Sequence, residues 1–319
     1  MKFAFRHVPF SPAQCEELTA IAAAAGHETK WLGPEVPEVS TLADCEALMG
    51  YFPPDKMKEL PLLRWVQTPA AGVEKLCGDI YANPDVVLTN CSGAFGVAIA
   101  EYMLTGLLML MRNMPAYLEN QHQHLWKCIG TCGSIYGSTI TVVGMGDIGT
   151  RFAERAKAMG AHIRGVRRNV NGENPACYDE VYATAQLADA VRDVDAVVMC
   201  LPGTAATTKV INTEVFAAMS PRTIVVNCGR GYTVDQDAMI AALQEGRIAG
   251  AVLDVAAVEP MPADCPLWDM PNVIVTPHIS GHDDDPVNIQ FMYAIFKENM
   301  QRFIAGEPLT HVVNRSRGY

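Results

Sequence analysis

Three side chains in the last third of the chain could together reduce a carbonyl group: Arg230, Glu259 and His278. Imidazole titrates near neutral pH, so His278 could donate the proton that a developing alkoxide needs. The carboxylate of Glu259 could hold the second ring nitrogen and favour the protonated ring. The guanidinium of Arg230 could grip a carboxylate and a carbonyl oxygen. Each residue alone could equally be structural, so the chemistry depends on what brings them together.

Each of these residues comes shortly after an apolar, partly β-branched run that is typical of a buried strand. The runs cover residues 223–227, 251–255 and 273–276. In an open parallel α/β sheet, ligands bind outside the carboxyl ends of the strands. We therefore expect the arginine, the glutamate and the histidine to converge at one edge of a sheet.

A glycine-rich turn with the spacing G-x-G-x-x-G follows a predicted strand at 139–143 and opens a helix predicted to run to 159. The first glycine permits a tight turn, the second lets a pyrophosphate approach the backbone, and the third lets helix and strand pack closely. The helix N-terminus adds N–H groups and a positive dipole end. The turn predicts a dinucleotide site formed by Gly144, Met145, Gly146, Asp147, Ile148 and Gly149.

The end of the next predicted strand, 162–166, indicates which dinucleotide binds. An acidic residue about 20 positions after the glycines would hold the ribose 2′-hydroxyl of NAD. This chain has Arg167 and Arg168 there instead. Guanidinium groups suit a 2′-phosphate, so the sequence favours NADP(H), with NAD(H) possible. The alternative is that both arginines are solvated surface charges.

The rest of the chain alternates between short apolar runs and amphipathic stretches, which predicts parallel sheets covered on both faces. Ser11, Pro12 and Gln14 form a helix-start signal with a capping box. A further apolar stretch, 94–111, is predicted to be a buried helix. The other predicted strands are 47–52, 62–67, 86–89 and 196–201, and the other predicted helices are 235–245 and 288–305.

The glycine turn, the segment NCGRG, the Asp-to-Glu-Pro segment and TPHISG resemble, in order and spacing, the motifs of the D-isomer-specific 2-hydroxyacid dehydrogenase family. The resemblance implies a Rossmann-type dinucleotide-binding domain at 94–282. It also implies a smaller, discontinuous, flavodoxin-like α/β substrate domain at 1–93 and 283–319. Arg230, Glu259 and His278 would be the catalytic residues of an enzyme that reduces 2-oxo acids to D-2-hydroxy acids.

The resemblance also implies the binding residues. The segment 68–73 resembles the family's substrate loop, so Ala71 and Gly72 would hold the substrate carboxylate together with Arg230. Arg168 resembles the arginine of NADP-using glyoxylate and hydroxypyruvate reductases, which favours a small 2-oxo acid. The helix carrying Glu101 and Arg112 resembles one that builds a homodimer. The cofactor would further be lined by Leu201, Pro202, Cys228, Asp254, His278 and Gly281.

Composition excludes some partners and points to a compartment. The chain has 24 basic and 35 acidic residues among 319 and no basic run, so nucleic acid and anionic membranes are poor partners. The stretch 94–111 is interrupted by Glu101 and is short for a membrane span. Ten scattered cysteines without C-x-x-C, and a beginning unlike a signal peptide, favour the cytoplasm.

Other residues of the chain could support different chemistries. His124, Cys128 and Cys132 could line one helix face near His122, but zinc sites use closer cysteine spacing, so no metal is expected. Cys228 beside Arg230 could be an activated thiol. The same motifs also resemble a nucleotide-sensing regulator of the corepressor type, although the chain lacks that class's basic tails. A formate dehydrogenase is disfavoured because Glu259 stands where that branch uses glutamine.

Overall fold

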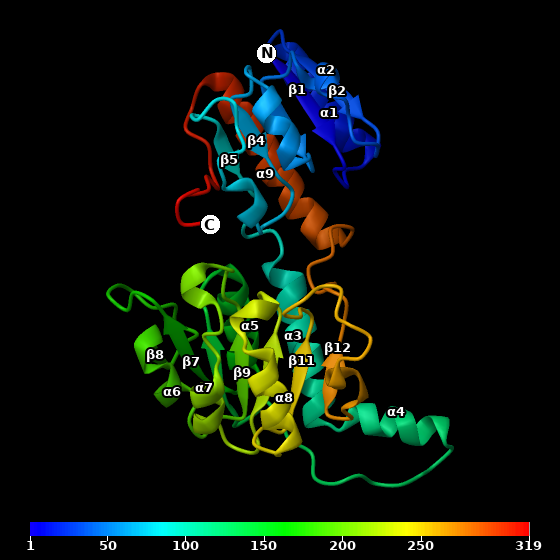
Figure 1. Ribbon diagram of the computed structural model, residues 1–319, viewed down its shortest axis with the longest axis vertical. Coiled ribbons are helices and arrows are strands. Elements are labelled where there is room, and N and C mark those ends of the chain that lie inside the picture. The colour runs from blue at the N-terminus through cyan, green and yellow to red at the C-terminus, as the bar shows by residue number, and fades with distance from the viewer. Residues whose placement is uncertain (319) are drawn as a thin grey trace. The chain divides into compact units, whose positions relative to one another are not determined.

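The computed structural model describes residues 1–318, so residue 319, the last of the expected substrate domain, lies outside the described residues. The chain forms two compact units (Figure 1). One consists of Met1–Phe95 and the chain from His282 onward, and the other is Gly96–Gly281. Each unit is built on its own parallel sheet with helices on both faces, as the sequence predicts.

The first unit contains a five-stranded sheet in the order β2-β1-β3-β4-β5, and every neighbouring pair is parallel. The order 2-1-3-4-5 is that of flavodoxin-like folds, which confirms the predicted class of this unit. The strands are β1 (Lys2–Arg6), β2 (Glu28–Leu32), β3 (Ala47–Gly50), β4 (Trp65–Gln67) and β5 (Val87–Thr89).

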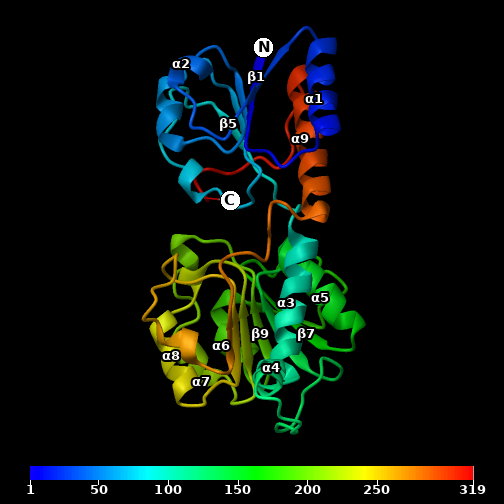
Figure 2. The ribbon, with the colours of Figure 1, turned by 90° about the vertical axis from the view of Figure 1, so that its right-hand side faces the viewer.

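Helices cover both faces of this sheet. Figure 2 shows α1 (Pro12–Ala24) and α9 (Pro286–Ala305) on one face and α2 (Val39–Leu42) on the other. The capping box of Ser11 and Gln14 starts α1 as predicted, and α9 ends at Gly306 with a φ of +70°. Short 3₁₀ turns η1 (Pro54–Glu59) and η2 (Glu74–Leu76) complete the unit.

The core of the first unit follows from the alternation of side chains along its strands. Phe3 on β1 meets Trp65 and Phe303, while its neighbour Ala4 belongs to the apolar cluster on the opposite face. The Trp65 and Phe303 rings lie 5.0 Å apart. Both faces of the sheet are therefore buried, which is the usual condition of a parallel sheet.

The second unit contains a seven-stranded parallel sheet in the order β12-β11-β10-β9-β6-β7-β8. Counted from β6, this is the doubly wound order 3-2-1-4-5-6 with a seventh strand added, so the Rossmann-type prediction is confirmed. The strands are β6 (Thr139–Val143), β7 (His162–Arg167), β8 (Glu180–Ala183), β9 (Ala196–Met199), β10 (Ile224–Asn227), β11 (Gly250–Leu253) and β12 (Val273–Val275).

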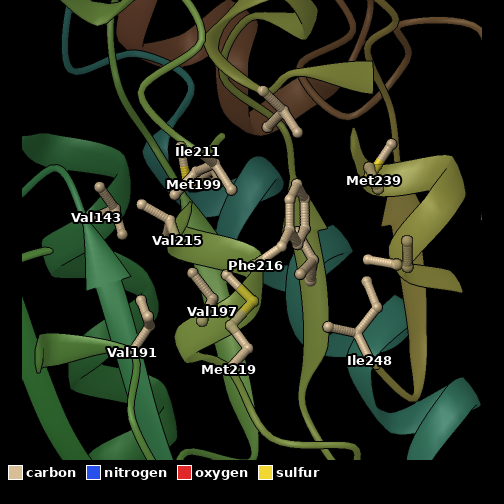
Figure 3. Packing of buried hydrophobic residues seen from close by; sticks show 14 of the residues in the cluster. Val143, Val191, Val197, Met199, Ile211, Val215, Phe216, Met219, Met239 and Ile248 are labelled. Atoms are coloured by element: carbon tan, nitrogen blue, oxygen red, sulfur yellow. The ribbon is translucent and has the colours of Figure 1, made fainter. Parts of the chain in front are cut away.

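Two helix layers enclose this sheet (Figure 2). One contains α3 (Gly96–Met111) and α5 (Asp147–Ala158). The other contains α6 (Leu187–Ala190), α7 (Thr213–Ala218) and α8 (Gln236–Gln244), whose apolar side chains meet the strands around Phe216 (Figure 3). The remaining elements are α4 (Met114–His122), η3 (Thr184–Gln186), η4 (Ala205–Thr207), η5 (Gly231–Thr233) and η6 (Pro266–Asp269).

Three strands were absent from the sequence-based expectation: β1, β2 and β8. These three strands mix charged or polar residues with apolar ones, as in the sequence KFAFR of β1. The prediction had relied on continuous apolar runs. The strands β2 and β8 are edge strands, so no second neighbour demands an apolar run there. Several predicted strands are also shorter, since β3 ends at Gly50 and β9 at Met199.

Candidate active site

The carboxyl ends of β10, β11 and β12 lie side by side in the second unit. The parallel register pairs Asn227 with Leu253, and Leu253 with Val275. The segments that follow these strands, which carry Arg230, Glu259 and His278, therefore leave the sheet at one edge. This is the edge at which open α/β sheets bind ligands.

His278 and Glu259 form a direct pair at this edge. His278 Nδ1 lies 2.9 Å from Glu259 Oε2. The other carboxylate oxygen, Oε1, accepts the backbone N–H of Ala256 at 3.0 Å, which fixes the carboxylate from behind. The side chains are 51% and 40% exposed. Because Nδ1 is engaged by Glu259, Nε2 is the ring nitrogen left to meet a substrate.

The backbone at His278 is held in the left-handed region, with a φ of +57°. Such a conformation is uncommon for a residue with a side chain and persists where neighbours impose it. The His278 N–H donates to the carbonyl of Asp254 at 2.8 Å. The Asp254 side chain is buried and accepts the N–H groups of Ile279 and Ser280, each at 2.8 Å. Asp254 thus organises the turn that presents His278.

The loop with Arg230 is organised by Asn227 at the end of β10. The Asn227 amide accepts the Gly229 N–H at 3.1 Å and donates to the Arg230 carbonyl at 3.2 Å. A β-carbon at Gly231 would lie 1.8 Å from the Ala256 carbonyl oxygen. The loop that carries Arg230 is therefore packed directly against the segment that leads to Glu259.

The three glycines of the turn before α5 have distinct surroundings. Gly144 has a φ of +107°, and a β-carbon there would come within 2.7 Å of the Cys200 carbonyl oxygen. A β-carbon at Gly149 would come within 2.0 Å of the Gly144 carbonyl oxygen, whereas one at Gly146 would meet no atom within 4 Å. Gly146 caps α5 without any side-chain hydrogen bond. This helix start, which has open space beside Gly146 and no side chain bonded to its first N–H groups, suits the pyrophosphate of a dinucleotide.

The side chains of the other residues in the turn pack against neighbouring segments of the same unit. Met145 Sδ would lie 2.6 Å from a β-carbon at Gly165. Asp147 is paired with Arg151 at 3.4 Å, and burial raises the pKa of its carboxyl group. A β-carbon at Gly96 would come within 2.1 Å of Asp147 Oδ2. The Asp147 carboxylate thus occupies the space beside Gly96, and Ile148 is half-buried in the first turn of α5.

The residues at the end of β7 are basic. Arg167 Nη1 lies 3.5 Å from both the Glu173 carbonyl oxygen and Asn174 Oδ1, and Arg168 is exposed. Leu201, Pro202 and Gly281 follow the ends of other strands, with Leu201 and Gly281 half-buried and Pro202 exposed. No acidic side chain stands at 167 or 168, where a ribose 2′-hydroxyl would require one.

Cys228 does not fit the role of an activated thiol. It is buried, and burial raises the pKa of its thiol well above the usual value, with the Asp254 carboxylate adding to the shift. A reactive cysteine needs a lowered pKa and access to solvent. Cys228 is therefore a small wall residue between β10 and its loop.

The expected substrate loop lies in the first unit and is tied to a buried amide network. Asn90 Nδ2 donates to the Ala71 carbonyl at 2.8 Å, and the Cys91 N–H donates to the Ala70 carbonyl at 3.0 Å. Gln67, fully buried, donates to the Thr68 carbonyl at 3.1 Å. Ala71 and Gly72 are half-buried. The loop is thus held by contacts within its own unit.

The segment weighed for zinc is not helical where its ligands would be. α4 ends at His122, and His124, Cys128 and Cys132 follow in an exposed loop rather than on one helix face. Within residues 1–318, no group of three or more His, Cys, Asp or Glu side chains is arranged to hold a metal ion. In the same residues, no helix is both long and apolar enough to cross a membrane.

Two residues that the sequence analysis did not single out touch the site. Thr276 Oγ1 donates to Asp254 Oδ1 at 2.6 Å, and the Tyr102 hydroxyl lies 2.5 Å from the same Thr276 Oγ1. The position of Thr276 directly before Pro277-His278 was a usable signal, because a threonine hydroxyl at the end of a strand can hydrogen-bond the turn that follows. Tyr102 gave none, since it lies in an apolar helix that the chain places 174 residues earlier.

Comparison with known proteins defines the class. The family model described as D-isomer specific 2-hydroxyacid dehydrogenase, NAD binding domain, matches residues 104–280, more than half of the chain. The structure of a D-isomer specific 2-hydroxyacid dehydrogenase family protein from Aeromonas salmonicida is similar with a TM-score of 0.85 and 31% identity, covering 98% of this chain and 99% of that one. This chain belongs to the D-isomer specific 2-hydroxyacid dehydrogenase family, whose members are NAD(P)-dependent oxidoreductases of 2-hydroxy acids.

Two further relatives have named activities. Glyoxylate/hydroxypyruvate reductase A of Salmonella newport is 28% identical over 84% of this chain and 85% of its own. An NADPH-dependent glyoxylate/hydroxypyruvate reductase from Sinorhizobium meliloti, solved with NADP and sulfate, has a TM-score of 0.82 and 26% identity, with 100% of both chains covered. The chain spans about half the length of the D-3-phosphoglycerate dehydrogenases that it also matches.

Proposed function

We propose that this protein uses NADPH to reduce a small 2-oxo acid, glyoxylate or hydroxypyruvate foremost, to the corresponding 2-hydroxy acid, which has the D configuration wherever the product is chiral. The observation that carries the proposal is the 2.9 Å pair of His278 and Glu259 at the sheet edge to which the Arg230 loop also belongs. The small substrate is supported by the two similar proteins named as glyoxylate/hydroxypyruvate reductases.

The proposed roles follow from the geometry of each side chain. Arg230 and the N–H groups of Ala71 and Gly72 bind the substrate carboxylate and present the carbonyl carbon in one orientation. His278 donates the proton on Nε2 to the carbonyl oxygen as negative charge develops there. Glu259 holds Nδ1 and stabilises the ring before the proton leaves. The bound nicotinamide supplies the hydride that the carbonyl carbon receives.

The proposed cofactor site uses both the turn and the neighbouring strand ends. The turn Gly144, Met145, Gly146, Asp147, Ile148 and Gly149 receives the pyrophosphate, for which Gly146 leaves open space. Arg167 and Arg168 bind the 2′-phosphate, which makes NADPH the better cofactor. The other residues that line the cofactor are Leu201, Pro202, Cys228, Asp254, His278 and Gly281.

The same proposal assigns a role to each unit. Gly96–Gly281 is the dinucleotide-binding domain, and the five-stranded unit is the substrate domain, contributing Ala71 and Gly72. The chain passes from one unit to the other between residues 95 and 96 and between residues 281 and 282, whereas the expected boundaries lie at 93/94 and 282/283.

We also propose that two copies of the chain associate through α4 and the segment 123–137. Large apolar side chains are exposed there, with Trp126 fully exposed, Tyr136 at 81% and Leu125 at 49%. Figure 1 shows α4 and this segment at the margin of the second unit. Burying such a patch against a second copy is the common solution for an exposed apolar surface. Light scattering on the wild type should give twice the chain mass, and Trp126→Ser should shift it toward the single-chain mass.

The compartment is proposed from the thiols. Cys45, Cys91, Cys177, Cys228 and Cys265 are buried free cysteines in the cores of both units. Buried thiols of this kind persist in a reducing environment, which supports the cytoplasm.

The proposal is tested by the decay of reduced-nicotinamide absorbance with a panel of 2-oxo acids. The panel runs from glyoxylate and hydroxypyruvate through pyruvate to 2-oxoisocaproate and phenylpyruvate, each with NADPH and with NADH. Fastest oxidation with NADPH and the two smallest acids is expected. Equal kcat/KM for both cofactors would refute the role of the arginines. No turnover despite tight nucleotide binding would favour a nucleotide-sensing regulator.

A further inference from the structure

The hydroxyl of Tyr102 is connected to the turn of His278 by two consecutive hydrogen bonds. Tyr102 lies in α3 and its hydroxyl is 2.5 Å from Thr276 Oγ1, which is 2.6 Å from Asp254 Oδ1. All three residues belong to the second unit. The connection therefore runs from α3, a helix that covers the sheet, to the strand ends that carry the site residues.

The chemistry of the groups decides which of them donates. Asp254 is buried, and its carboxylate already accepts two backbone N–H groups, from Ile279 and Ser280. An ionised carboxylate only accepts, so Thr276 must give its single hydroxyl proton to Asp254. Thr276 Oγ1 can then only accept from Tyr102. Burial raises the pKa of Tyr102 to about 12, so the phenol keeps its proton at neutral pH.

This order of donors acts on the backbone next to His278. The N–H groups that Asp254 accepts belong to the two residues directly after His278, and the Asp254 carbonyl accepts the His278 N–H. His278 has a positive φ, so its ring direction depends on these bonds. The hydroxyl of Thr276 fixes one carboxylate oxygen, and the hydroxyl of Tyr102 fixes the rotamer of Thr276.

We propose that Tyr102 is a positioning residue for the proton donor: through Thr276 and Asp254, its hydroxyl sets the orientation of His278 toward the substrate. The inference rests on the proposed function of His278 and deepens it. It assigns to α3, otherwise a packing helix, one contact that acts on catalysis. Tyr102 itself touches neither substrate nor cofactor in this role.

The test compares variants that remove one hydroxyl at a time. Tyr102→Phe should lower kcat for the best 2-oxo acid about three- to tenfold, the effect expected from one hydrogen bond of ordinary strength. The dissociation constant for NADPH should stay within about twofold, because no cofactor contact is lost. Thr276→Val should lower kcat further, and Thr276→Ser should recover most of that loss because it retains the hydroxyl.

A double variant and a matched control make the test specific. If Tyr102 acts only through Thr276, Tyr102→Phe/Thr276→Val should be no slower than Thr276→Val alone. Losses that multiply would overturn the inference, as would a wild-type kcat in Tyr102→Phe. Tyr182→Phe is the control, since it removes a phenol hydroxyl bonded to Glu180 in the same unit, away from the turn. An equal loss of kcat in this control would also overturn it.

Amide hydrogen exchange separates this inference from the proposed function. Ile279 and Ser280 donate to Asp254, so their N–H groups should exchange faster in Tyr102→Phe than in the wild type, whether or not the enzyme turns over any acid tested. If the wild type reduces no 2-oxo acid, the proposed function fails, while faster exchange would still support the hydrogen-bond connection. Unchanged exchange at both residues would overturn the connection itself.

Discussion

Two alanine substitutions in the glycine turn should have different effects. Gly149→Ala should lower the stability of the fold, whereas Gly146→Ala should weaken nucleotide binding. At Gly149 a β-carbon would lie 2.0 Å from the Gly144 carbonyl oxygen and 3.0 Å from Val142 Cγ1. A backbone oxygen cannot yield by rotating, so we expect Gly149→Ala to cost about 3 kcal/mol in free energy of unfolding. For a unit of this size that is roughly 6–12 °C in Tm. At Gly146, a β-carbon would meet nothing within 4 Å, and φ is −82°, which alanine adopts freely.

Gly146→Ala should therefore leave Tm nearly unchanged but damage nucleotide binding. Alanine is a poorer helix cap than glycine, which lowers the free energy of unfolding, but it also makes the unfolded chain stiffer, which raises it. The two effects should cancel to within about 0.5 kcal/mol. The added methyl group occupies the open space that we assign to the pyrophosphate. We expect the Kd for NADPH to rise at least tenfold, which is about 1.4 kcal/mol.

The assay pairs thermal unfolding without nucleotide with NADPH binding measured by the fluorescence of the reduced nicotinamide. Wild type and Gly146→Ala should unfold together, while Gly149→Ala should unfold several degrees earlier. An NADPH affinity in Gly146→Ala within about twofold of wild type would refute the assigned pyrophosphate position. Equal destabilisation by both substitutions would refute the contrast between open and occupied space.

Three further outcomes are expected. His278→Ala should lower kcat by about 10²–10⁴ through loss of the proton donor while NADPH still binds, and full activity in steady-state assays would contradict the role. Arg168→Ala should raise KM for NADPH about tenfold and leave KM for NADH almost unchanged, since only the former has a 2′-phosphate; a parallel change in both would contradict it. In the Trp126→Ser variant, in which the proposed contact between copies is lost, iodoacetamide at pH 8 should label Cys128 and Cys132 within minutes. Cys228, which is buried and has a raised pKa, should stay unlabelled until the protein unfolds, as intact-mass and peptide analysis would show.

Much of the architecture could be predicted because it depends on neighbours in the chain. The strand 139–143 was predicted with the bounds that β6 has, since a β-branched apolar run bounded by glycine has few other uses. The predicted helices 235–245 and 288–305 lie within two residues of α8 and α9 at each end, because helix ends are satisfied by local residues. The alternation of strands and helices then predicted parallel sheets covered on both faces, while the division into two domains came from the family resemblance.

The edge strands β2 and β8 could not be predicted in the same way. None of their residues is fully buried and their polarity is mixed, so their conformation is decided by pairing with β1 and β7 rather than by their own pattern. The zinc alternative also depended on a helix that ends at His122. Local sequence could not show that end, because no proline or glycine marks it directly.

By itself the sequence determined the glycine turn, the alternation of apolar strands with helices, and the residue types at the strand ends, because these depend on backbone geometry within a few residues. Only the tertiary structure decided that His278 Nδ1 meets Glu259 at 2.9 Å and that Gly146 alone of the three glycines faces open space. It alone placed the Tyr102 hydroxyl against Thr276, 174 residues later in the chain. Such contacts depend on how a helix packs on a sheet, and the sequence pattern of neither segment indicates which residues will meet.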